Sequence, residues 1–172
     1  HELASSAYND RRKNCENTVA ALQKAYPEKE IKTLRDATWE MLDAVKNDVS
    51  DEDMKRSRYV LAEKDRVLAV CEALKRGDYQ EVGKKMYETH EGLSNEYEVS
   101  CEELDFLNDI AKECGVCGSR MMGGGFGGCT INLVKEDLYD TFISTAKERY
   151  KEKYDKVPEV YDVVISDGAR KL

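Results

Sequence analysis

Prolines, histidines and long apolar stretches are scarce in this sequence. The 172 residues include only two prolines, Pro27 and Pro158, and two histidines, His1 and His90. The longest apolar stretch, residues 129–134, is short and broken by polar side chains. A membrane-spanning helix needs about 18 apolar residues. The sequence therefore predicts no such span, and two isolated histidines give no support to a metal site.

Positive charge is in deficit. Lys and Arg number 27 against 35 Asp and Glu, for a net charge of −8. An acidic chain repels the phosphates of nucleic acids and of anionic lipids, so we expect neither nucleic acid nor a membrane as a partner. With 41% hydrophobic and 36% charged residues, the chain can bury a core and keep a solvated surface. Its length fits one domain, or a large part of a bigger one.

The six cysteines are irregularly spaced in a Lys- and Glu-rich chain. Disulfide scaffolds are usually short, secreted and dense in cysteine, so we expect reduced thiols and a cytoplasmic protein. Cys114 and Cys117 have zinc or redox spacing, but no second Cys or His pair follows at ligand spacing. We interpret them as two thiols flanking a turn at Gly115.

Helical periodicity dominates the first 115 residues. Ser5 or Ser6 is expected to cap a first helix that ends near Ala25, and Ser50 with Asp53 to cap a long third one. A capping box is expected at Ser100, with Glu103 as its partner. The predicted helices cover residues 6–25, 38–45, 51–76, 80–95 and 101–114.

The pattern changes after residue 115. Residues 116–121, 129–134 and 160–165 are strand-like, the last ended by Ser166-Asp167-Gly168, and residues 136–154 return to helical spacing. The order over 116–172 is then strand, glycine loop, strand, helix and strand. This predicts an α+β fold with a small antiparallel sheet packed against several helices.

Several single residues are interpreted structurally. Trp39 is expected in the core, and His90 is expected as a surface or capping residue on a polar helix face. In the third helix Val67 and Cys71 are expected to face inward with Val60 and Leu74. The pair Arg11 and Arg12, next to Asp10, is typical of a solvated salt-bridge cluster.

Glycines gather in one short segment. Six of the 11 lie between positions 118 and 128. Gly123, Gly125 and Gly128 match G-x-G-x-x-G, but a strand follows instead of the helix that a dinucleotide fingerprint requires. Gly-Lys-Ser/Thr, which a Walker loop needs, is absent. Glycine lets a backbone approach a neighbouring group closely, so we favour a role beside a ligand over a long hairpin turn.

Three stretches together resemble galactokinases, a family of the GHMP kinase superfamily. They are residues 3–12 (LASSAYNDRR, followed by Cys15 and Glu16), 97–101 (YEVSC, followed by Leu104 and Asp105) and 118–130 (GSRMMGGGFGGCT). The resemblance implies a ferredoxin-like C-terminal domain of a GHMP-type kinase over residues 1–172. The first residue is His and not Met, which suggests a piece cut from a longer protein or a trimmed terminus.

The resemblance also implies an activity. Galactokinases transfer the γ-phosphate of ATP, with Mg²⁺, to the anomeric hydroxyl of D-galactose. Their ATP loop and their catalytic Asp and Arg are not found in this sequence and are expected upstream of residue 1, so no catalytic residue is assigned here. We expect the chain alone to bind no cofactor, to be inactive, and to self-associate through the face that meets the missing N-terminal half.

The resemblance assigns binding residues as well. Tyr8 matches a tyrosine that hydrogen-bonds the sugar, whereas Met122 departs from the Thr of many relatives. A galactose- and ATP-binding regulator, an N-acetylgalactosamine kinase, and a helical interaction domain with a purely structural hairpin remain alternatives. The residues expected to line the cleft are Gly123, Gly124, Gly125, Phe126, Gly127 and Gly128.

Overall fold

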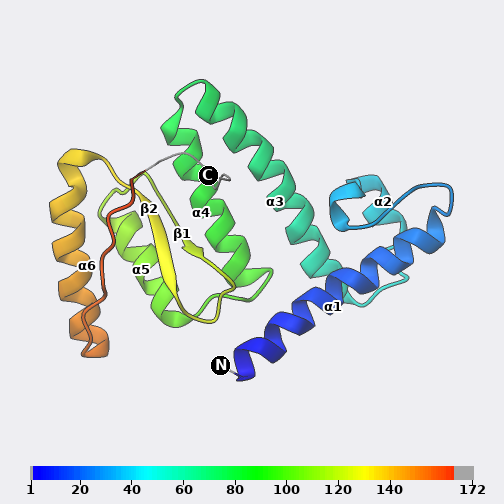
Figure 1. Cartoon of the computed structure of the whole chain (residues 1–172), viewed down its shortest axis with the longest axis horizontal. Helices are drawn as coiled ribbons and strands as arrows, with labels where there is room; N and C mark the ends of the chain where they lie inside the picture. The colour runs from blue at the N-terminus through cyan, green and yellow to red at the C-terminus, as the bar shows by residue number, and fades with distance from the viewer. Residues whose placement is uncertain (1, 165–172) are drawn as a thin grey trace, which may run out of the picture.

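The computed structural model describes residues 2–164, with side chains from residue 7 onward. Helices precede a two-stranded sheet, and a last helix packs against α5 (Glu102–Glu113), the helix that lies along the sheet (Figure 1). The α+β class, with a small antiparallel sheet packed against several helices, is confirmed. The elements are α1 (Glu2–Ala25), η1 (Leu34–Asp36), α2 (Trp39–Ala44), α3 (Asp51–Lys75), α4 (Tyr79–Asn95), α5 (Glu102–Glu113), β1 (Gly118–Met122), β2 (Cys129–Leu133), η2 (Glu136–Leu138) and α6 (Tyr139–Tyr154).

The helix boundaries confirm some expected caps and correct others. The Ser50 side chain accepts a hydrogen bond from the Asp53 amide at 3.0 Å, as its spacing predicts. However, Ser5 and Ser6 lie inside α1, which is already helical at Glu2, the first described residue, because good helix formers precede Ser5 and leave no break for a cap. The capping box at Ser100 is also wrong. Cys101 precedes α5 without a side-chain cap, while Ser100 donates to Asp105 Oδ1 at 2.6 Å.

The sheet is one antiparallel hairpin that lies against α4 and α5. Its register pairs Gly118 with Leu133 and Met122 with Cys129. β1 begins two residues later than expected, at Gly118, which packs so closely on α4 that a β-carbon there would lie 2.4 Å from the Gly83 Cα. The connection between the two strands is therefore residues 123–128, which we call the glycine loop.

The strand expected over 160–165 is not formed in the described part, residues 160–164. No sheet partner faces it there, and Val163 and Val164 are 76% and 85% exposed. β-branched residues favour strands mainly by packing on a half-buried surface, and this segment has none. Ile165 and Ser166-Asp167-Gly168 lie outside the described residues.

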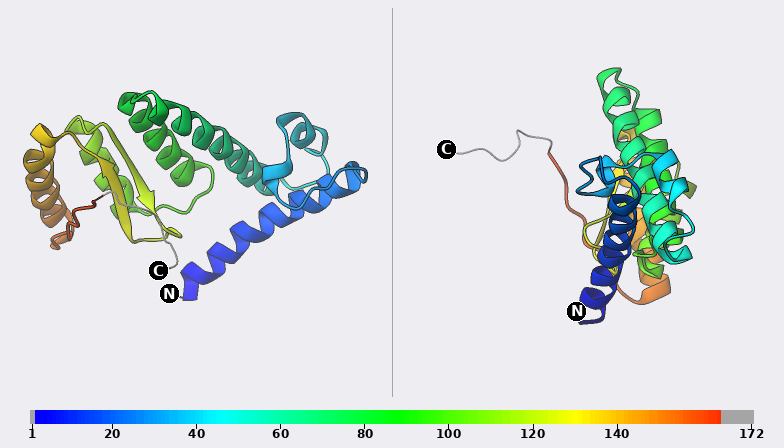
Figure 2. Two further views of the ribbon diagram at one scale, coloured as in Figure 1. Left: turned by 45° about the horizontal axis from the view of Figure 1, so that its top comes forward. Right: turned by 90° about the vertical axis from the view of Figure 1, so that its right-hand side faces the viewer.

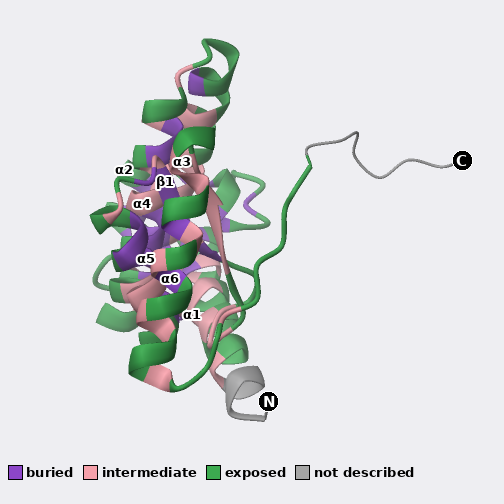
Figure 3. Ribbon diagram, turned by 90° about the vertical axis from the view of Figure 1, so that its left-hand side faces the viewer, coloured by how far each residue is buried: buried purple, intermediate pink, exposed green. Residues whose placement is uncertain are grey.

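Three apolar clusters form the interior. One joins α1, α2 and α3, a second joins α5 to α6, and a third, around Val99, Leu104 and Met121, lies beneath the glycine loop. Figure 3 shows the buried surface concentrated between the helices, with the outer face of α6 exposed. No helix in the described part of the chain is long and apolar enough to cross a membrane.

Four expected core positions are wrong. Val67 and Leu74 of α3 are 53% and 51% exposed and Cys71 is exposed as well, because after Leu61 only Ala73 of this helix is buried. Trp39 is 37% exposed, since its Nε1 donates to Asp65 Oδ2 at 2.8 Å and Arg58 stacks on its ring. These polar partners keep the Trp39 ring at the surface.

Candidate functional site

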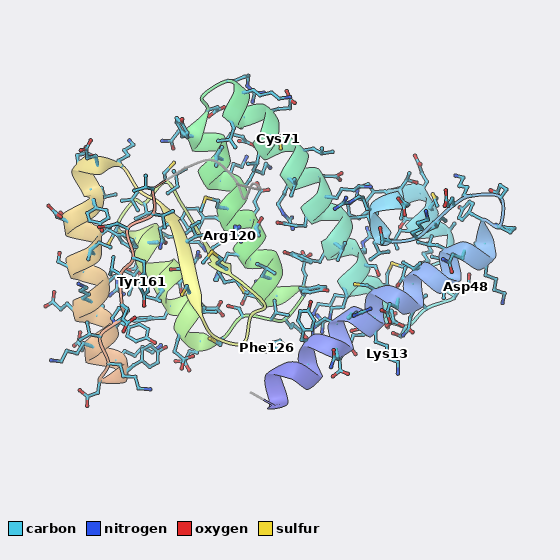
Figure 4. All side chains as sticks on the ribbon, viewed as in Figure 1. Lys13, Asp48, Cys71, Arg120, Phe126 and Tyr161 are labelled. Carbon is cyan, nitrogen blue, oxygen red and sulfur yellow. The ribbon has the colours of Figure 1, made fainter. Side chains whose placement is uncertain are left out.

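The glycine loop approaches the N-terminal half of α1, the helix that carries Tyr8, as the left view of Figure 2 shows. A β-carbon placed on Gly124 would lie 3.9 Å from Cδ2 of Tyr8. Tyr8 is 55% exposed, so its hydroxyl is free to meet a ligand. In Figure 4, Phe126 marks the tip of the loop, next to the N-terminal half of α1. The structure thus brings together the two parts of the chain expected to bind.

The loop backbone is almost entirely left-handed. Among its six residues only Gly124 lies outside that region, and a β-carbon on Gly123 or Gly127 would meet nothing within 4 Å. The loop therefore has open space on part of its surface and can present backbone N–H and C=O groups there. The φ angles are +92° at Gly123, +85° at Gly125, +60° at Phe126, +127° at Gly127 and +103° at Gly128.

The other side of the loop is docked on Val99. The Phe126 amide donates to the Val99 carbonyl at 2.7 Å. A β-carbon on Gly125 would lie 2.3 Å from that carbonyl oxygen and 2.8 Å from the Val99 Cβ. Glycine at 125 is therefore required by contact with the protein itself, and the side-chain position there is filled by Val99.

Residues 96–99, which we call the bracket, connect the loop to α1 and α3. Arg11 of α1 donates to the carbonyls of Tyr97 at 2.6 Å and of Glu98 at 3.0 Å. Arg56 of α3 donates to the Glu96 carbonyl and to the Glu98 carboxylate. One short segment thus holds both the helix that carries Tyr8 and the glycine loop.

Charge in the bracket is strongly paired. Arg56 is 2% exposed, and an Arg this deeply buried requires anionic or carbonyl partners. Hydrogen bonds from Arg56, and next from Lys55 at 2.7 Å, lower the pKa of the Glu98 carboxyl to about 2. Glu98 itself takes a left-handed φ of +52°, which non-glycine residues rarely adopt.

His90 is buried, so its expected surface position is wrong. It is 4% exposed, its Nδ1 accepts the Met121 amide at 3.0 Å, and its Nε2 lies 3.0 Å from Asp105 Oδ1. Burial lowers the pKa of His90, against an opposing effect of Asp105. A neutral His90 thus fixes the end of β1, just before the glycine loop.

The glycine loop and its strands carry no side chain suited to proton transfer. Residues 121–133 contain no Asp, Glu, His or Lys, so the loop and its strands supply no general base. In the described residues no group of three potential ligands is placed to hold a metal ion. A separate polar pocket between α1 and the start of α3, which includes Asn14 and Asp53, contains neither Tyr8 nor the loop.

The sequence reasoning missed the bracket as a structural element. Arg11 was interpreted as part of a solvated cluster, which holds for its neighbour Arg12, paired with Glu16 at 2.8 Å on the surface. The pairing of Arg56 with Glu98 could not be predicted, because an ion pair between residues distant in sequence produces no periodic pattern. The uncommon YEVS run was the one available clue.

The chain is similar to known GHMP kinases. The family described as "GHMP kinases C terminal" matches residues 71–164. A galactokinase of Clostridium beijerinckii is 43% identical over 99% of this chain and 43% of its own length. One of Thermotoga maritima is 38% identical over the whole chain and 46% of its own length.

A solved galactokinase structure is similar to this chain as well. The crystal structure of Lactococcus lactis galactokinase complexed with galactose matches with a TM-score of 0.76 and 31% identity, over 88% of this chain and 39% of that one. The chain thus spans less than half the length of the curated relatives named above. The expected resemblance to galactokinases is confirmed, and the chain belongs to the GHMP kinase C-terminal family.

Proposed function

We propose that this chain is the C-terminal portion of a galactokinase, an enzyme that transfers the γ-phosphate of ATP to the anomeric hydroxyl of D-galactose. The observation that carries the proposal is the placement of Tyr8 against the glycine loop. A phenol hydroxyl and a loop with open backbone groups suit a small polyhydroxylated ligand better than a macromolecule.

In this function the chain binds and orients the sugar. The Tyr8 hydroxyl hydrogen-bonds a sugar hydroxyl, and the loop residues 123–128 line the cleft beside it. Fixing an acceptor in a reactive orientation supplies a large part of catalysis in phosphoryl transfer. The base, its Arg partner and the ATP loop lie in the remainder of the full-length protein.

The described residues do not fit a site for Mg²⁺. The glycine loop and its strands carry no carboxylate, and no acidic cluster suited to a metal occurs among residues 2–164. We therefore assign the metal to the rest of the full-length protein, and the resemblance to galactokinases assigns the ATP loop there as well. Free cysteines fit a cytoplasmic location, where thiols stay reduced.

A coupled assay of ADP release tests the proposal. The full-length protein is given ATP and Mg²⁺ with D-galactose, with N-acetylgalactosamine, or with no sugar, and this chain alone is given the same mixtures. We expect turnover only by the full-length protein, and only with galactose. Preference for N-acetylgalactosamine would reassign the substrate, while galactose binding without turnover would favour a regulator.

A further inference from the structure

We infer that Arg56 and Glu98 are positioning residues for the sugar site, which they act upon through the bracket without touching the sugar; this inference rests on the proposed function. The structural reason is that residues 96–99 contact both halves of the candidate site. Arg11 attaches the bracket to the helix of Tyr8, and the Val99 carbonyl attaches it to Phe126.

The bracket is too strained to hold this shape by itself. Glu98 has a φ of +52°, a conformation that costs a non-glycine residue free energy unless its surroundings enforce it. Arg56 provides that enforcement, because one planar guanidinium reaches the carbonyl before Glu98 and the carboxylate of Glu98. Lys55 adds a second cation at 2.7 Å from Glu98 Oε1.

Displacement of the bracket would propagate in two directions. On one side Tyr97 would move, and with it the carbonyl that Arg11 holds, one helical turn from Tyr8. On the other side Val99 would move, and with it the carbonyl that accepts the Phe126 amide. Gly125 packs so closely on this carbonyl that an added β-carbon would lie 2.3 Å from its oxygen, so the glycine loop has to move with Val99. The distance between Tyr8 and the loop therefore depends on the Arg56–Glu98 pair.

Two variants of the full-length protein isolate this pair. Glu98→Gly removes the carboxylate that Arg56 holds, and because glycine adopts negative φ as readily as positive φ, nothing then fixes the bracket in its present shape. Arg56→Lys keeps the positive charge but cannot reproduce the two-pronged contact of a guanidinium. Glu16→Gln is the matched control, since it breaks the exposed Arg12–Glu16 pair on α1 and leaves the bracket intact.

Two readouts are combined. We expect Glu98→Gly to raise the KM for galactose about tenfold, the effect of one charge-assisted hydrogen bond, while the KM for ATP stays near wild type. The melting temperature should fall, but the protein should still fold, because Arg56 also donates to Glu52 Oε1 at 3.1 Å. Hydrogen exchange at the Phe126 amide, which bonds to Val99, should become faster in both variants. Glu16→Gln should change neither readout.

Several results would overturn the inference. One is an unchanged galactose KM in Glu98→Gly, and another is a parallel rise in both KM values that follows a loss of stability. If Arg56→Lys does not fold, Glu98→Gly alone decides. If wild-type protein lacks sugar kinase activity, the proposed function fails separately, and unchanged Phe126 exchange in Glu98→Gly would then refute the positioning role while faster exchange supports it.

Discussion

Gly124 lies against the ring of Tyr8, with 3.9 Å between the position of a Gly124 β-carbon and the Tyr8 Cδ2. The two residues come from the first helix and from the connection of the only hairpin in the described part of the chain. Their contact joins the first and third of the stretches that resemble galactokinases. It defines one small surface on which the proposed sugar binding can be tested.

Removing the Tyr8 hydroxyl should weaken sugar use more than nucleotide use. A neutral hydrogen bond contributes about 0.5–1.5 kcal/mol, so Tyr8→Phe should lower kcat/KM for galactose about 2- to 13-fold in the full-length protein. Tyr79→Phe is the control, because Tyr79 is similarly exposed at 58% but lies at the start of α4. An equal loss for ATP, or an equal loss in Tyr79→Phe, would assign Tyr8 to packing.

Gly125→Val should destabilise the protein more than Gly77→Val. Both glycines have positive φ, at +85° and +69°, so a β-branched residue costs about 1–3 kcal/mol of backbone strain at either position. Only at Gly125 does the added side chain also strike Val99, since nothing lies within 4 Å of a β-carbon on Gly77. Thermal melting measures the difference, and equal losses would mean that the loop is not docked on Val99.

Acidification should lower the stability of the fold, because His90 is buried in its neutral form. Its pKa is lowered from an ordinary 6.5 in the folded protein, so the unfolded chain takes up the proton first as the pH falls. The stability due to neutral His90 is therefore complete above about pH 6.5 and is lost progressively below it.

His90→Asn provides the comparison, because its side-chain oxygen can accept the Met121 amide but does not titrate. Melting temperatures of both proteins are followed from about pH 7.5 to about pH 5.5, the range in which histidine titrates. We expect a steeper fall in wild type. Identical slopes would mean that His90 is protonated as easily in the folded chain as in the unfolded one.

Reducing agent and chelator should leave stability unchanged. The cysteines of the described residues are free, and Cys117 donates its thiol hydrogen to the Tyr79 carbonyl at 3.0 Å. Melting curves with dithiothreitol or EDTA should overlay the untreated curve. A large drop in melting temperature with dithiothreitol would reveal a structural disulfide. A large drop with EDTA would reveal a metal site at Cys114 and Cys117.

Local signals in the sequence predicted local structure well. Ser50 caps α3, Gly115 takes the left-handed conformation after α5, and the hairpin with its glycine connection lies where expected. Such features depend on neighbours along the chain. Family motifs, and not periodicity, indicated that Tyr8 would share a site with the loop.

Features that depend on distant partners were not predicted. His90 looked like a surface residue because its burial is set by Met121 and Asp105, on other elements. Arg56 is buried against the bracket, and a helical pattern in the sequence cannot predict such a contact between distant segments. The strand expected at residues 160–165 shows the reverse error, since β-branched residues favour a strand where they pack on a half-buried surface, and Val163 and Val164 are exposed.

The most direct test of a sugar site at the Tyr8–Gly124 contact is calorimetric titration of galactose into the full-length Gly124→Val protein. Gly124 is the loop residue outside the left-handed region, and its β-carbon would make only an ordinary contact, so the fold should tolerate the change. We predict an unchanged melting temperature and ATP affinity but a galactose Kd raised about tenfold or more, because the new side chain occupies the cleft beside Tyr8. Galactose affinity equal to that of wild type would contradict a sugar site at this surface.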